Sequence, residues 1–165
     1  MIIQAGPQDA APLKKLVESA YRGDLARAGW THEADLVQQE RITHAELAEL
    51  LHSPAAHVLI AWRGGVICGC VAVTQGEAGA VSIGMLCTDP QLQASGIGSA
   101  LLAAAEECAV RQGARIARMC VIDVRESLIA WYLRKGYADT GRRIPFPQMQ
   151  TPPLQFAVLA RILDR

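Results

Sequence analysis

The feature that most constrains this sequence is a pair of glycines between a strand that has to end and a helix that follows it. The apolar run AVSIGMLCTDP predicts a strand that stops by Pro90, since proline cannot donate to a sheet ladder. From Ile97 to Gln112 apolar side chains recur at helical spacing, and Gly113 follows as a C-terminal cap. Gly96 and Gly98 open this helix, so the N–H groups of its first turn are expected to bind a phosphate.

Two common phosphate motifs do not fit this loop. A Walker A loop requires Gly-Lys-Ser/Thr, whereas Gly98 is followed by Ser99 and Ala100. A dinucleotide fingerprint requires a small residue three positions after Gly98, where Leu101 stands. The hairpins predicted upstream also do not fit a doubly wound sheet. A flavin- or nucleotide-binding α/β protein is therefore kept only as an outside alternative.

The remaining patterns predict one mixed α/β domain over residues 1–165. MIIQ predicts a short strand and DAAPLKKLVESA a helix, and Thr43 with Glu46 forms a capping box before a second helix. AHVLIAW and VICGCVAVTQ predict a hairpin. ARIARMCVID predicts a buried parallel strand, and ESLIAWYLRK a short helix. The proline-rich segment RRIPFPQMQTPP is expected to be a loop before one last strand, LQFAVLARIL.

Charge and hydropathy exclude several classes of partner. The 16 Lys and Arg residues balance the 16 Asp and Glu residues, so the chain has no electrostatic footprint for nucleic acid or an anionic membrane. No window reaches the roughly 18 apolar residues of a membrane span. The first residues lack the pattern of a secretory signal, so we expect a cytoplasmic protein.

The five cysteines show neither the spacing of a disulfide framework nor that of a zinc site, and no metal is expected. Cys68 and Cys70 are two positions apart in a predicted strand. We therefore expect them to share one face as small buried residues. Free thiols also agree with a reducing compartment.

The segment QASGIG, from Gln93 to Gly98, resembles the Gln/Arg-x-x-Gly-x-Gly/Ala signature of the GNAT superfamily of N-acetyltransferases. LCTDP before it and IAWYLRKGYADTG after it resemble two further blocks of that superfamily, in the same order. WYLRKGYADTGRRIPFP resembles one of its subgroups. The resemblance implies the acyl-CoA N-acyltransferase fold, in which antiparallel strands precede a βαβα unit with a splayed pair of parallel strands. It also implies acetyl-CoA as cosubstrate.

The resemblance assigns residues to the acetyl-CoA site. The pyrophosphate is expected on the loop amides, and the pantetheine arm on the preceding strand, where Gly84 is a candidate position for a β-bulge. Tyr132 takes the place of the family's proton donor to the leaving thiolate, with an ordinary core tyrosine as the alternative, and Trp131 is expected to pack. Many relatives have an asparagine where Ser127 is the nearest substitute. The expected cofactor-binding residues are Leu86, Cys87, Thr88, Gln93, Ala94, Ser95, Gly96, Ile97, Gly98, Ser99 and Ser127.

The acceptor side is expected in two loops, which contribute Trp30, Glu33 and Phe146. Aromatic rings with a carboxylate would suit a cationic amine, whereas no glutamate on AVSIGML can serve as a base. The implied function is transfer of an acetyl group from acetyl-CoA to a primary amine of a small molecule or peptide, by direct attack on the thioester. A non-catalytic acyl-CoA-binding or regulatory domain on the same fold is the alternative. Because exposed sheet edges often pair between subunits, a homodimer is considered.

Overall fold

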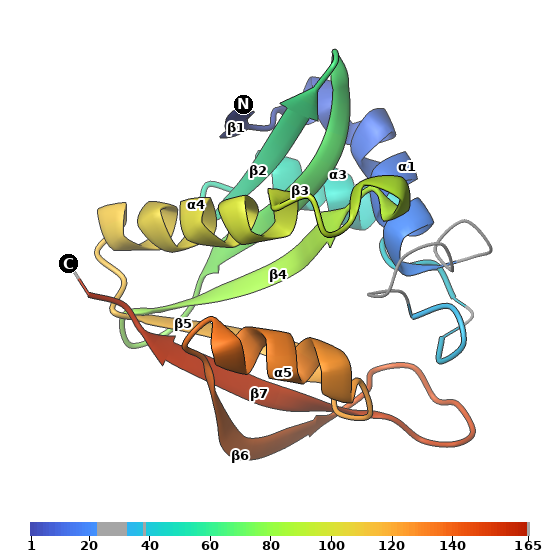
Figure 1. The fold of residues 1–165 in the computed structure, drawn as a ribbon, viewed down its shortest axis with the longest axis vertical. Helices are drawn as coiled ribbons and strands as arrows, with labels where there is room; N and C mark the ends of the chain where they lie inside the picture. Colours follow the sequence, from blue (N-terminus) through green and yellow to red (C-terminus); the bar gives the residue numbers. More distant parts are fainter. Residues whose placement is uncertain (23–32, 38, 165) are drawn as a thin grey trace.

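The computed structural model describes residues 1–22, 33–37 and 39–164 (Figure 1). The described residues form one mixed sheet of seven strands in the order β1-β2-β3-β4-β5-β7-β6. The strands are β1 (Ile2–Gln4), β2 (Ala56–Arg63), β3 (Val66–Gln75), β4 (Ala80–Thr88), β5 (Ile116–Ile122), β6 (Ala138–Pro145) and β7 (Gln155–Ile162). The helices are α1 (Ala10–Tyr21), α3 (His44–His52), α4 (Ile97–Arg111) and α5 (Glu126–Arg134), with short 3-10 turns η1 (Pro7–Asp9) and η2 (Pro90–Leu92).

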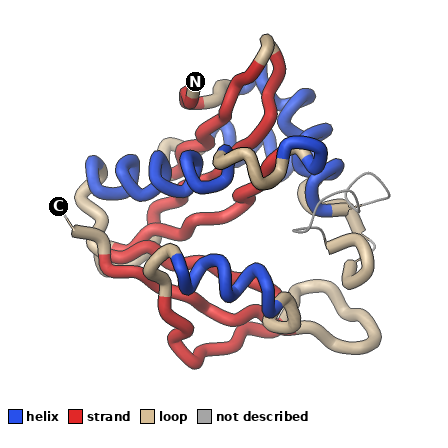
Figure 2. The backbone as a smooth tube through the Cα atoms, in the orientation of Figure 1, coloured by secondary structure: helices blue, strands red, loops and turns tan. Residues whose placement is uncertain are grey.

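Helices cover both faces of the sheet, as the tube in Figure 2 shows. Alternation along the strands creates the two cores, because successive side chains of a strand point to opposite faces. Val71 and Val73 of β3 belong to the core that also contains α4 and Tyr132 of α5. Cys70 and Ala72 of the same strand belong to the core formed with α1 and α3. The sheet is therefore the middle layer, as expected for a mixed α/β domain.

The two parallel strands pair over only three residues at their N-terminal ends. β4 and β5 are in register at Ala80 with Ile116, at Val81 with Ala117 and at Ser82 with Arg118. Beyond this short ladder the two strands diverge, and β5 continues beside β7 (Figure 1). The splayed parallel pair predicted from the sequence is thus confirmed. Within the described part of the chain, the edge of β4 that faces the opening has no strand partner from Ile83 to Thr88.

A β-bulge interrupts β4 where the strands diverge. Cys70 pairs with Cys87 and Ala72 pairs with Gly84, so two residues of β4, Met85 and Leu86, lie opposite a single residue of β3. Met85 has a left-handed φ of 55°. The bulge was expected at Gly84, and this position is wrong, because Gly84 still keeps its regular partner. The direction of the strand changes at the next two residues, Met85 and Leu86, instead.

Two other sequence predictions are wrong in detail. Cys68 and Cys70 lie in opposite cores, because the β2–β3 register shifts at Ala61 and leaves Cys68 as an extra residue of β3. The segment predicted as a loop, residues 142–153, overlaps the last four residues of an unpredicted strand, β6, which pairs with β7 at the sheet edge. Most of its residues are exposed and polar, so it lacks the apolar alternation that predicts a strand.

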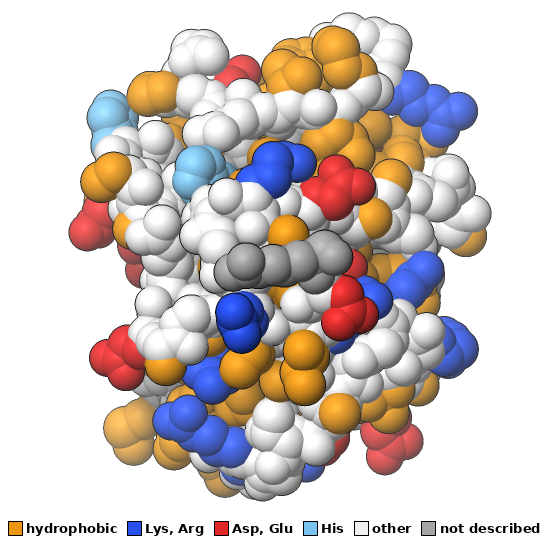
Figure 3. Space-filling model, turned by 90° about the vertical axis from the view of Figure 1, so that its left-hand side faces the viewer, with side chains coloured by type: hydrophobic (Ala, Val, Ile, Leu, Met, Phe, Trp, Pro, Cys, Tyr) orange, Lys and Arg blue, Asp and Glu red, His pale blue; other side chains and the backbone are white. Residues whose placement is uncertain are grey.

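The described surface carries charges of both signs. On the face seen in Figure 3, acidic and basic side chains lie among one another rather than in separate fields. No helix among the described residues is long and apolar enough to cross a bilayer.

Candidate active site

The loop between β4 and α4 presents the start of a helix to the opening in the sheet. Asp89 first caps the η2 turn by accepting a hydrogen bond from the N–H group of Gln91 at 2.9 Å. The backbone then adopts left-handed conformations at Ala94, with a φ of 65°, and at Gly96, with a φ of 86°. Gly96 is the N-cap of α4 and provides no side-chain cap. The first-turn N–H groups of α4 are thus available to an anion.

A first cavity of about 310 Å³ lies between this loop, β4 and α5. Eight of the eleven residues expected at the cofactor site line it: Leu86, Cys87, Thr88, Gln93, Ala94, Gly96, Gly98 and Ser99. Ser95, Ile97 and Ser127 are not among its lining residues. Ser95 donates its hydroxyl to the carbonyl of Leu92, Ile97 packs against the core, and Ser127 is exposed on α5. Their contacts with a cofactor remain predictions.

Tyr132 stands on α5 with its side chain in the wall of this cavity. The centroid of its ring is 5.0 Å from the ring centroid of Trp131 and 5.9 Å from that of Tyr137, and both contacts are edge-to-face. Burial raises the pKa of the Tyr132 phenol above its ordinary value, so the hydroxyl stays protonated at neutral pH. Trp131 packs against the core, as expected, and also lines the cavity. Neighbouring positions of a helix are about 100° apart, and the cavity is wide enough to reach both.

A second cavity of about 270 Å³ lies on the other side of Tyr132. Tyr21, Leu86, Leu128 and Tyr132 line both cavities. Glu33 and Phe146, the expected acceptor-binding residues, line the second one. Trp30 lies outside the described residues. The structure therefore brings the two expected sites together at one wall.

Glu33 is held between two arginines in this second cavity. Its Oε1 accepts hydrogen bonds from Nε and Nη2 of Arg22 at 3.2 and 2.8 Å. Its Oε2 accepts one from Nη1 of Arg125 at 3.1 Å. All three side chains are at most 9% exposed. The carboxylate thus orders two buried guanidinium groups, a function that the sequence did not indicate.

Three further residues of the site were missed by sequence reasoning. Tyr21 lines both cavities and donates its hydroxyl to the Leu86 carbonyl in the bulge, at 2.5 Å. Lys135 donates to Ser99 Oγ at 2.8 Å and places its ammonium group 5.2 Å from the Trp131 ring centroid. Arg41 lines the second cavity. Tyr21 continues the apolar stripe of its helix, so its periodicity is that of a core residue.

Among the described residues, no group of three or more His, Cys, Asp or Glu side chains is arranged to hold a metal ion. The polar groups that line the two cavities include backbone amides, phenols, guanidinium groups and three carboxylates.

Comparisons with known proteins agree with this architecture. YncA of Salmonella typhimurium, whose structure contains its cofactor acetyl-CoA, aligns with a TM-score of 0.75 at 16% identity, over 100% of this chain and 94% of that chain. The ribosomal-protein-S18-alanine N-acetyltransferase from Escherichia coli aligns with a TM-score of 0.77 at 13% identity, over 100% of this chain and 94% of that chain. An acetyltransferase of the GNAT family from Staphylococcus aureus aligns with a TM-score of 0.74 at 15% identity, over 99% of both chains. At these identities the likeness concerns the fold.

The assignment to a family comes from a comparison of the sequence with protein families. A search among curated protein sequences found no match. The acetyltransferase (GNAT) domain family, however, matches residues 26–150, which include the loop between β4 and α4, both parallel strands and α5. The chain therefore belongs to the GNAT family of acetyltransferases.

Proposed function

We propose that this protein is an N-acetyltransferase that transfers the acetyl group of acetyl-CoA to a primary amine of a small molecule. The observation that carries the proposal is the shared wall of the two cavities, with Tyr132 in both linings. The first cavity would take the donor, and the second would take the acceptor. A transferase that joins two substrates directly requires two adjacent pockets of this kind.

The residues of the first cavity fit the groups of acetyl-CoA. A Cβ atom built on Gly98 would have only Thr88 Oγ1 near it, at 3.7 Å, so space for an oxyanion is left over the start of α4. The left-handed backbone at Ala94 and Gly96 and the first turn of α4 would hold the pyrophosphate through N–H groups. Lys135, at the C-terminal end of α5, would add a cation beside Ser99. The free edge of β4 would hydrogen-bond to the pantetheine arm.

The reaction itself needs little more than position and one proton. Acetyl-CoA supplies an activated thioester carbon, to which the amine nitrogen forms a bond as the carbon–sulfur bond breaks. Tyr132 would give its phenolic proton to the departing sulfur. Burial keeps this proton on Tyr132 at neutral pH, since burial raises its pKa. The bulge at Met85 and Leu86 would direct backbone N–H groups of β4 toward the thioester oxygen.

Water would take the proton that the amine loses. The three carboxylates in the described lining of the second cavity all have partners within the protein. Glu33 accepts from two arginines, Glu40 accepts from Lys14 at 2.8 Å, and Glu46 accepts from the Thr43 N–H group at 2.7 Å. None of them is placed as a dedicated base.

We also propose a cytoplasmic location. The five cysteines are free thiols, and the Sγ atoms of Cys70 and Cys87 are 3.6 Å apart without a bond. A reducing compartment supports this state.

The function is tested by following the release of free coenzyme A thiol while the protein is supplied with acetyl-CoA and a panel of amines. Tyr132→Phe should lower kcat at least tenfold and leave the Kd for acetyl-CoA unchanged, because the phenyl ring keeps the packing and removes only the proton. Leu133→Ala, a substitution at an exposed neighbour on α5, is the matched control. If acetyl-CoA binds and no amine is acetylated, the protein is a binding domain and the proposed function is wrong.

A further inference from the structure

We propose that the acceptor amine carries a carboxylate group, as an amino acid does, and that Arg41 recognises this carboxylate in the second cavity. The inference rests on the proposed function, because it concerns the acceptor of the same reaction. It makes Arg41 a specificity-determining residue of the site.

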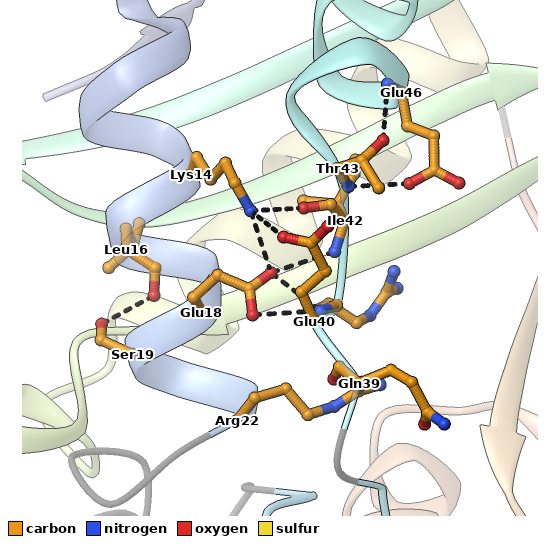
Figure 4. Close-up of polar contacts among 11 residues, drawn as sticks. Lys14, Leu16, Glu18, Ser19, Arg22, Gln39, Glu40, Ile42, Thr43 and Glu46 are labelled. Atoms are coloured by element: carbon orange, nitrogen blue, oxygen red, sulfur yellow. Dashed lines mark hydrogen bonds and ion pairs between the residues drawn. The ribbon is translucent and has the colours of Figure 1, made fainter.

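The backbone of Arg41 is fixed by α1. Glu18 of α1 accepts hydrogen bonds from the Arg41 N–H group at 2.8 and 3.0 Å, and from the Ile42 N–H group at 3.0 Å. Lys14, one turn earlier, donates to the Ile42 carbonyl at 2.7 Å and to Glu40 at 2.8 Å (Figure 4). The segment that leads into α3 is thus clamped to α1 on both sides of Arg41. A residue held in this way can present its side chain in one direction.

The side chain of Arg41 stacks on a wall that both cavities share. Its guanidinium carbon lies 5.1 Å from the ring centroid of Tyr21. Tyr21 is itself held by the hydrogen bond from its hydroxyl to the Leu86 carbonyl. A guanidinium group placed over an aromatic ring through its carbon still has N–H groups that can bind both oxygens of a carboxylate. Among the described residues, no carboxylate forms an ion pair with Arg41.

Of the three arginines among the described lining residues, Arg41 is the one that forms no ion pair. The buried wall of the cavity holds two arginines, Arg22 and Arg125, against one carboxylate, Glu33. Glu40 is engaged by Lys14, and Glu46 lies exposed at the rim, where it caps α3. Among the described residues that line the cavity, three arginines thus face three carboxylates, all of which already have partners within the protein. An acceptor that carries its own carboxylate would supply an anion to Arg41.

The size of the cavity limits the acceptor further. About 270 Å³ is enough for a small molecule, and Phe146 and Phe156 contribute aromatic rings to the lining. A carboxylate on Arg41 and an amine near Tyr132 would lie across this one cavity. Free amino acids combine these two groups within a few bonds.

The experiment compares L-amino acids with their amides, which keep the amine and lose the carboxylate charge. Wild-type protein and Arg41→Gln are assayed for acetylation of phenylalanine, glutamate and alanine and of the matching α-amides, and binding of each acid is measured by calorimetry. Arg111→Gln, which removes an exposed arginine of α4, is the control. We expect Arg41→Gln to raise the KM of the acids about tenfold or more and to leave the KM of the amides unchanged. Arg41→Lys should recover part of the loss, since it keeps the charge without the bidentate fork.

The outcomes separate the two proposals. An equal effect of Arg41→Gln on acids and amides, or a wild-type protein that binds no amino acid, overturns the carboxylate inference even where other amines are acetylated. Binding of an amino acid that depends on Arg41, without acetylation of any amine, upholds the inference and refutes the proposed function. An unchanged melting temperature of Arg41→Gln shows that a changed KM reflects recognition rather than unfolding.

Discussion

Replacing Gly98 by alanine should separate phosphate binding from folding, because the structure needs no glycine at this position. Gly98 is the second residue of α4, its φ is not left-handed, and an added Cβ would lie at an ordinary contact distance of 3.7 Å from Thr88 Oγ1. Alanine is the better helix former by about 0.5–1 kcal/mol in a helix interior. Gly98→Ala should thus leave the free energy of unfolding unchanged or raise it slightly.

The same methyl group would occupy the space that we assign to the pyrophosphate of coenzyme A. Displacing a phosphate from one charge-assisted hydrogen bond costs about 2 kcal/mol, which corresponds to a roughly thirtyfold rise in Kd. Calorimetric titration with coenzyme A measures the Kd, and urea unfolding measures the stability. Gly113→Ala, at the far end of α4 and outside both cavity linings, is the control with the opposite profile. Its φ of 82° makes any side chain strained, by about 1–2 kcal/mol, although no atom lies within 4 Å. Wild-type affinity of Gly98→Ala, in a folded protein, would refute the assignment of the pyrophosphate to the start of α4.

Three more substitutions test the remaining parts of the site. Glu33→Gln should lower the free energy of unfolding by about 3–5 kcal/mol, because it leaves two buried arginines without their anion, and a loss below about 1 kcal/mol in urea unfolding would show that water replaces it. Tyr132→Phe should reduce the rate at which the free energy of unfolding decreases as the pH rises above about 10. Burial raises the folded pKa of Tyr132, so above about pH 10 only the unfolded chain releases this proton, and stability falls by up to about 1.4 kcal/mol per pH unit. Urea midpoints between about pH 9 and 12 measure this slope, and an equal slope in both proteins contradicts the shift. Lys135→Met should raise the Kd for coenzyme A about tenfold at low salt and less at high salt, whereas an equal Kd would place Lys135 outside the phosphate site.

The local signals of the sequence predicted those elements that local chemistry determines. Thr43 and Glu46 form the capping box expected from their spacing, with hydrogen bonds of 3.1 and 2.7 Å. Gly113 follows α4 with a left-handed φ of 82°, as a C-terminal cap requires. The order of strands and helices around the glycine pair also agrees with the structure. In each case the determining residues lie within one or two turns of the element that they begin or end.

Features that depend on pairing between strands could not be predicted in the same way. The extra residue at Cys68 and the bulge at Met85 are set by how β3 fits its two neighbours. No residue type indicates the first, and Gly84 indicates the second only to within one position. β6 forms a strand because it pairs with β7 at the edge of the sheet. Its own residues, most of them exposed, show no alternation of apolar and polar side chains that would predict a strand. The role of Glu33 was also hidden, because Arg125, one of its two partners, is 92 positions away in the sequence.

The active site follows from one interruption of the sheet. Parallel pairing of β4 and β5 ends after Ser82, so the side chains beyond it must be covered by other elements. α1 supplies Tyr21 and α5 supplies Tyr132, and these two rings line the space on both sides of the bulge at Leu86. Because Tyr21 also fixes the Leu86 carbonyl, the strand edge that would hold the donor and the aromatic surface under Arg41 are parts of one rigid wall. A substitution of Tyr21 that keeps the ring and removes the hydroxyl should therefore affect the affinities for donor and acceptor together.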